Sequence, residues 1–189
     1  MQGLPDPTDE DAIAATRDWV EKAVVGLNLC PFARAVHIGG RIHYAVSAAR
    51  DADALVGDLA REIEDLMAAD PAGRETTLLI HPHVMGDFLD YNDFLDIADA
   101  TIEALGHGGE LQVASFHPRY QFAGTDPEDV ENYSNRSPYP TLHLLREDSV
   151  ERAVEAMPDT DEIYENNIRT LERLGHEGWQ ALWKAGKGD

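Results

Sequence analysis

The sequence is poor in cysteine and in long apolar runs. Only one of its 189 residues is a cysteine, Cys30, which excludes an internal disulfide and is typical of a protein from a reducing compartment. No stretch approaches the ~18 apolar residues that span a bilayer, and the N-terminal segment lacks the basic start and apolar core of a signal peptide. We therefore expect a cytoplasmic protein that does not bind membranes.

Basic residues are also scarce. The chain has 15 lysines and arginines against 36 aspartates and glutamates, which gives a formal net charge of −21 spread along the chain. This charge argues against polyanionic nucleic acid as a partner. It is typical of a salt-loving host, because carboxylates keep a protein solvated while high salt screens their repulsion. An acidic protein from an ordinary cell is the alternative, and the charge indicates habitat more than function.

Several catalytic signatures are missing as well. The chain has no Gly-x-Ser-x-Gly nucleophile motif, no His-Glu-x-x-His and no paired Cys-x-x-Cys. Gly39 and Gly40 precede a predicted strand instead of following one, which is the wrong order for a dinucleotide or phosphate cradle. A function has to be inferred from other residues.

The sequence does contain an alternation of helix and strand patterns, set by the spacing of its apolar residues. The predicted helices lie at residues 8–29, 51–69, 88–105 and 161–183, and the predicted strands at 41–48, 76–80, 110–116 and 141–147. A short helix is expected after Ser149, and a break in the last helix near Gly175 or Gly178.

This alternation predicts an α/β fold, a single-domain sandwich over residues 1–189 with a mixed, mostly parallel four-stranded sheet flanked by helices. The first three strands are expected to be parallel, because a helix crosses over between each strand and the next. The fourth strand follows a long connection without a crossover helix. That connection permits either direction.

The long connection, residues 117–140, has no hydrophobic period but contains several aromatic and proline residues. Disordered linkers are poor in aromatics, and compact domains rarely keep a long structureless loop without a function. We therefore expect an ordered functional loop that packs its aromatic side chains against the sheet. In this interpretation His117, Asn135 and Arg136 face a cavity.

Two predicted strands end in a His-Pro pair, at His81 and at His117. Ligands of open α/β sheets bind outside the carboxyl ends of the strands, so we expect both imidazoles on this carboxyl rim, on neighbouring strands and within about 10 Å. His143, inside the fourth strand, would complete a three-histidine site for zinc or another transition metal. Alternatively, these histidines only end strands or form hydrogen bonds in the core.

The leading hypothesis for function is an enzyme acting on a polar or anionic small molecule at this rim. His117 would be the general base or a metal ligand, because imidazole titrates near neutrality, and Tyr120 would assist as a donor. Amide and guanidinium groups hold polar and anionic groups, and the predicted substrate-binding residues are Asn132, Asn135, Arg136 and Arg146. The alternative role of the arginines is to neutralise nearby carboxylates.

Cys30 supports a competing hypothesis. It lies at the predicted C-terminal end of the first helix, where the helix dipole raises a thiol pKa, so a reactive thiolate would need a nearby cation or metal. Cys30-Pro31 resembles the short Cys-Pro element of some haem-responsive proteins, which suggests a non-catalytic haem- or metal-binding module that uses Cys30 and a histidine. Burial as a small apolar residue is the alternative. A protein-interaction domain is the third class considered.

Three segments, "GLNLCPFA", "HPHVMGDFLDYNDFLDIAD" and "SFHPRYQFAGTDPEDVENYSNRSPYPTLHLLREDSV", resemble the bacterial domain-of-unknown-function family 1415. The resemblance covers nearly the whole chain. It marks positions of interest but implies no reaction, because this family has no established activity. The positions that it marks are Cys30, Pro31, His81, Asp87, Asn92, His117, Tyr120, Asn132, Asn135, Arg136, His143 and Arg146. His83 lies outside this pattern, which weakens a His-x-His metal motif.

Overall fold

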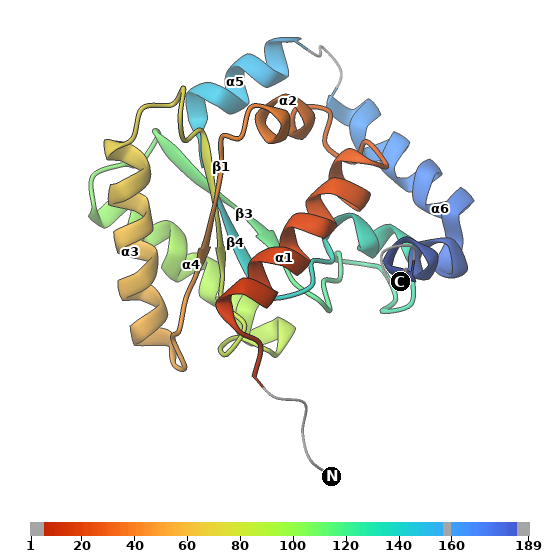
Figure 1. Ribbon diagram of the computed structural model, residues 1–189, viewed down its shortest axis with the longest axis horizontal. Coiled ribbons are helices and arrows are strands. Elements are labelled where there is room, and N and C mark those ends of the chain that lie inside the picture. Colours follow the sequence, from red (N-terminus) through yellow and green to blue (C-terminus); the bar gives the residue numbers. More distant parts are fainter. Residues whose placement is uncertain (1–5, 157–159, 185–189) are drawn as a thin grey trace.

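The computed structural model describes residues 6–156 and 160–184, and its centre is a four-stranded sheet with helices on both faces (Figure 1). The strands are β1 (Ile42–Val46), β2 (Thr76–Ile80), β3 (Leu111–Phe116) and β4 (Thr141–Arg146). Their spatial order is β1-β2-β4-β3. The predicted α/β class and mixed four-stranded sheet are confirmed.

The prediction of a mostly parallel sheet is wrong. Only β1 and β2 form a parallel pair, whereas β4 is antiparallel to both β2 and β3. The first three strands do run in one direction, because β2 and β3 are both antiparallel to the strand between them. The physical reason is the long loop before β4, which reverses the chain and inserts this strand between β2 and β3.

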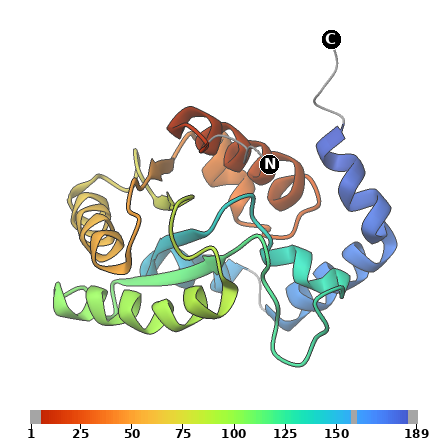
Figure 2. The same ribbon diagram turned by 90° about the horizontal axis from the view of Figure 1, so that it is seen from below.

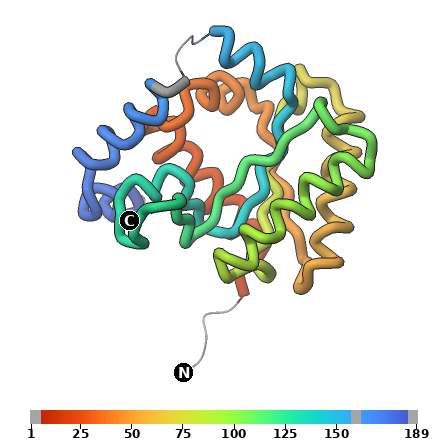
Figure 3. The backbone as a smooth tube through the Cα atoms, turned by 180° about the vertical axis from the view of Figure 1, so that it is seen from behind, coloured from red at the N-terminus to blue at the C-terminus, as the bar shows by residue number. Residues whose placement is uncertain are grey.

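One face of the sheet is covered by α3 (Ala52–Ala68) and α4 (Phe88–Ala104), which lie side by side (Figure 3). Asp51 caps α3 by accepting a hydrogen bond from the Ala54 amide. The apolar residues of both helices pack against one side of the strands. The buried core there includes Leu55, Leu59, Ile63, Leu66, Leu79, Phe94, Leu142 and Leu144.

The other face is covered by α1 (Asp9–Trp19), a π-helix (Val20–Val25) and α2 (Ala33–Ile38). Figure 2 shows α1 and α4 on opposite sides of the sheet. Thr8 and Asp11 form a capping box at the start of α1. The predicted helix to residue 29 is interrupted, because the α-helix widens into the π-helix and the chain then turns at Asn28 with a φ of 55°.

The last two described helices are α5 (Glu147–Ala156), which follows β4 directly, and α6 (Thr160–Lys184). The expected break in α6 lies at Gly175, whose φ of 62° favours glycine. The helix packs on a short 3₁₀ helix, Val130–Asn135, inside the long loop, where Tyr133 stacks on Trp179 at 4.6 Å between ring centroids. Within residues 6–156 and 160–184, no helix has the length and apolarity needed to cross a membrane.

Candidate functional site

The two histidines that end β2 and β3 lie on either side of β4, so the prediction that their strands are neighbours is wrong. Both imidazoles nevertheless pack against one side chain, Tyr91 of α4. Its ring centroid lies 5.8 Å from that of His81 and 5.1 Å from that of His117. Tyr91 lies on α4, outside the sheet, and contacts both histidines despite the intervening strand. We call His81, Tyr91 and His117 the rim cluster.

The ring nitrogens of both histidines hold the loop that follows β2. His81 Nδ1 lies 3.2 Å from the Val84 carbonyl oxygen, and His117 Nε2 lies 3.0 Å from that of Met85. A carbonyl only accepts, so these nitrogens carry the protons. His117 Nδ1 accepts a hydrogen bond from the Arg119 amide at 3.0 Å.

These bonds fix the tautomer of His117, and burial lowers its pKa. The side chain is therefore a neutral clamp between the loop after β2 and the long loop, and both of its ring nitrogens form hydrogen bonds. Its partner in the rim cluster, His81, is buried, and burial lowers its pKa to about 4. A catalytic role for His117, with Tyr120 as donor, stays a prediction.

The polar residues of the long loop are engaged within it. Asn132 accepts from the Phe122 amide at 2.9 Å and donates to the Asp126 carbonyl at 2.8 Å. Asn135 donates to the Ser115 carbonyl at 3.1 Å.

Arg136 donates from Nε to the Tyr120 carbonyl at 3.0 Å and from Nη2 to the Pro127 carbonyl at 2.6 Å. The Tyr120 ring packs on Phe88 at 5.2 Å, so this aromatic side chain lies against α4. Substrate binding by Asn132, Asn135 and Arg136 stays a prediction. Their hydrogen bonds account for how the loop is ordered.

Arg146 lies at the opposite end of the sheet from this cluster. It pairs with Leu111 at the start of β3, whereas Thr141 pairs with Phe116 next to His117. Its Nη2 donates to the carbonyls of Leu66 at 2.6 Å and Ala69 at 3.0 Å, which ties β4 to the end of α3. The structure therefore does not bring Arg146 to the predicted rim site.

His143 is also separate from the rim cluster. In the middle of β4 it pairs with Leu78 and Ala114, on the sheet face that carries α1, whereas Tyr91 packs on the other face. The predicted convergence of three imidazoles is therefore wrong. Among the residues that the structure describes, no group of three His, Cys, Asp or Glu side chains is placed to hold a metal ion.

The structure places His143 in a cavity of about 330 Å³ between the sheet, α1 with its π-helix, α2 and α5. Its walls are mostly aliphatic and aromatic. They comprise Trp19, Val20, Val24, Cys30, Phe32, Ala33, Val36, Ile42, Glu75, Thr76, Leu78, Gln112, Ala114, Phe116, His143, Leu145, Arg146, Ser149, Val150, Ala153 and Val154. None of His117, Asn135 and Arg136 belongs to this lining.

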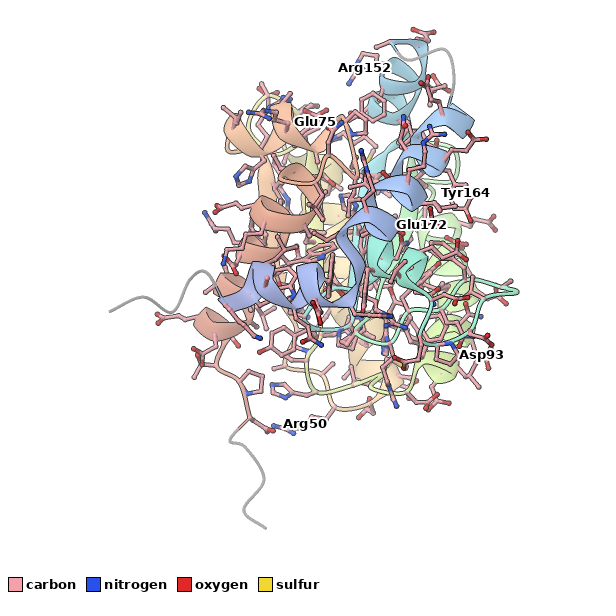
Figure 4. All side chains as sticks on the ribbon, turned by 90° about the vertical axis from the view of Figure 1, so that its right-hand side faces the viewer. Arg50, Glu75, Asp93, Arg152, Tyr164 and Glu172 are labelled. Atoms are coloured by element: carbon pink, nitrogen blue, oxygen red, sulfur yellow. The ribbon has the colours of Figure 1, made fainter. Side chains whose placement is uncertain are left out.

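Few charged side chains reach this cavity. Glu75 forms an ion pair with Arg41, and Arg146 is held by the α3 carbonyls. Figure 4 shows Glu75 and Arg152 at the same end of the molecule, and residues of α2 and α5 are part of the cavity lining. Cys30 is a free, half-buried thiol in the same wall.

Sequence patterns do not predict this cavity, because its lining comes from several separate stretches of the sequence whose apolar residues resemble ordinary helix and strand faces. The available signal is the size of the side chains. Ala33 of α2, Ala114 of β3 and Ala153 of α5 all line the cavity, and small residues leave space between elements. Such a signal becomes visible only once the elements are placed next to each other.

The family model described as "Protein of unknown function (DUF1415)" matches residues 11–181. This range includes both the rim cluster and the cavity, and it confirms the resemblance found in the sequence. Comparisons with curated proteins and with solved structures gave no match.

Proposed function

This chain belongs to the DUF1415 family of proteins of unknown function, and we propose a function for it. We propose that it binds a neutral, mostly apolar small molecule in the cavity between the sheet, α1 and α5. The observation that carries the proposal is the cavity itself, at about 330 Å³ with predominantly apolar walls. Small-molecule sites are typically concave and apolar, with a few polar groups and volumes of about 300 to 1,000 Å³.

The character of the walls supports an apolar ligand over water or an ion. Apolar cavities stay dry or take up apolar molecules, because their walls offer water too few hydrogen bonds. Burying apolar ligand surface contributes roughly 25 cal/mol per Å² before the costs of association. The net charge of −21 disfavours an anionic ligand, and the Nη2 of Arg146 at the cavity edge already donates to backbone carbonyls.

The test is a titration with neutral apolar fluorophores such as naphthalene derivatives. We expect saturable binding to the wild-type protein. In the variant Ala153→Trp an indole fills the cavity from α5, so binding weakens by about tenfold or more, given the size of one buried aromatic side chain. The matched control is Ala100→Trp, on the exposed side of α4, which should bind as the wild type does. Absence of saturable binding, or equal binding by both variants, would contradict the proposal.

A second candidate is haem, favoured by one specific observation: Cys30 and His143 line the same cavity. Cysteine thiolate and neutral imidazole are both side chains that hold haem iron, and burial lowers the pKa of His143 to about 4, which keeps its ring uncharged at neutral pH. Ferric haem added to the protein should give a Soret band that shifts in Cys30→Ser and in His143→Gln. A band that is identical in all three proteins would remove this candidate.

A further inference from the structure

The hydrogen bonds around His143 determine which ring nitrogen carries the proton. Thr76 Oγ1 lies 2.6 Å from the Leu144 carbonyl oxygen and 2.7 Å from His143 Nε2. A hydroxyl has a single proton, and the carbonyl can only accept it. His143 Nε2 must therefore donate to Thr76 Oγ1, which leaves Nδ1 as an unprotonated acceptor.

This acceptor has no protein partner. Within residues 6–156 and 160–184, no donor makes a hydrogen bond to His143 Nδ1. The ring lies in the cavity wall, where Ala114 pairs with it across the strands and leaves space beside it. His143 Nδ1 is not among the fully buried polar atoms without a partner, so it is open to the cavity, and a ligand that fills the cavity removes water from it. A ligand that supplies a donor is therefore preferred over one of the same shape without it.

A second unpartnered polar atom belongs to the same lining. The indole Nε1 of Trp19 is buried and has no hydrogen-bond partner in the described part of the chain, and the side chain is only 2% exposed. Trp19 and His143 both pack on Phe116, with ring centroids at 5.0 and 5.9 Å. Arg146 Nε is a further buried donor of this lining without a hydrogen-bond partner among the described residues. The His143 and Trp19 rings thus share one phenyl neighbour, and His143 Nδ1 is the unpartnered acceptor there.

We infer that the cavity selects neutral alcohols or phenols, whose hydroxyl group donates a hydrogen bond to His143 Nδ1. A hydroxyl is a small uncharged group that supplies the donor that His143 Nδ1 lacks. The inference rests on the proposed function, since it names the ligand class of the same cavity. Selectivity then comes from one polar contact, and affinity comes from the apolar walls.

The experiment compares naphthol with the methylnaphthalene that has the same substitution position, because the two molecules differ only in a hydroxyl or a methyl group. Transfer from water into an apolar site favours methylnaphthalene over naphthol, because naphthol has a polar hydroxyl group that loses its hydrogen bonds to water. A preference for naphthol therefore requires a polar contact in the cavity. We expect the wild-type protein to bind naphthol about tenfold or more tightly, the size of one satisfied buried hydrogen bond. In His143→Phe the preference should be lost while methylnaphthalene still binds. His107→Phe, outside the cavity, should keep it.

The outcomes separate the two proposals. If neither compound binds, the proposed function fails. If both bind and methylnaphthalene binds equally or better, the cavity is a binding site but the inference about hydroxyl ligands is wrong.

Spectra of the wild-type protein with isotope-labelled histidine provide a measurement that does not depend on the folding of a variant. His143 should be the Nε2–H tautomer, and its Nδ1 resonance should shift with naphthol but not with methylnaphthalene. An Nδ1–H tautomer, or no shift with naphthol, would overturn the inference.

Discussion

The hydroxyl of Tyr91 donates a hydrogen bond of 2.8 Å to the carbonyl oxygen of Thr141, the first residue of β4. The same hydroxyl accepts from the Phe116 amide at 3.1 Å, at the end of β3. One helical side chain therefore satisfies two backbone groups at the point where the inserted strand begins. Burial raises the pKa of Tyr91, so the phenol keeps its proton and the donor bond is maintained.

We predict that Tyr91→Phe lowers the free energy of unfolding by about 1 to 3 kcal/mol, because a buried carbonyl and a buried amide lose their partner while the ring packing is kept. Urea denaturation measures the change. Tyr164→Phe is the matched control, since that side chain is 51% exposed and should change stability little. Equal stability of the two variants would show that water replaces the missing hydroxyl.

His117→Ala tests whether this residue is a clamp or a catalyst. The substitution leaves the Met85 carbonyl and the Arg119 amide without their partner and removes the ring contact with Tyr91. We expect a loss of about 2 to 4 kcal/mol in unfolding free energy. His107→Ala, whose histidine pairs with Glu110 at the surface, should have a much smaller effect. Unchanged stability of His117→Ala would instead favour the catalytic prediction.

The elements of the fold were predictable because apolar spacing determines them locally. Leu55, Leu59, Ile63 and Leu66 recur at helical spacing, and all four are buried in α3. The order of the strands was not predictable in this way. The same residues of β4 would satisfy an apolar pattern at the edge of the sheet or between β2 and β3, and only long-range pairing decides between them.

The candidate site shows the same limit. Alternation along β4 correctly places His143 on the face of Thr141 and Leu145, but it does not reveal which helix layer covers that face. The position of Arg146 shortly after the long loop groups it with the loop residues in the sequence. It nevertheless lies at the far end of an antiparallel strand.

A third prediction concerns pH. Burial lowers the pKa values of His81 and His143 from 6.5 to about 4, so between these values the unfolded chain binds protons that the folded chain does not. The free energy of unfolding should therefore fall as the pH decreases through this window, with a limiting slope of about 1.4 kcal/mol per pH unit for each histidine. Urea denaturation at several pH values measures the slope. His143→Phe should reduce it, and an unchanged slope would contradict the assignment.

A fourth prediction concerns salt. With a net charge of −21, repulsion among carboxylates exceeds the attraction within exposed ion pairs such as Arg50–Asp6. Salt screens both, with a Debye length that falls from about 10 Å at ~0.1 M to about 3 Å at ~1 M. The melting temperature should therefore rise over this range. A constant or falling value would favour an acidic protein from an ordinary cell over one from a salt-loving host.

The last prediction assigns part of this repulsion to particular residues. Asp96, Asp99 and Glu103 recur on α4 at intervals of three and four, which places like charges next to each other on the helix surface. The pKa of Asp99 is raised, first by burial and then by Asp96 and Glu103.

Asp96→Asn removes one of these charges with little change in shape. It should raise the free energy of unfolding at low salt by a few tenths of a kcal/mol, roughly the size of one like-charge pair on a helix, and by less at ~1 M salt. Asp53→Asn is a poor control because Asp53 lies in the first turn of α3, where the helix dipole favours an acid. Glu165→Gln is better suited, because it removes a carboxylate that faces Arg169 at 3.6 Å. That change should lower stability at low salt, so the two variants are expected to differ in sign. If both variants gain stability equally, the repulsion comes from the total charge and not from the α4 acids.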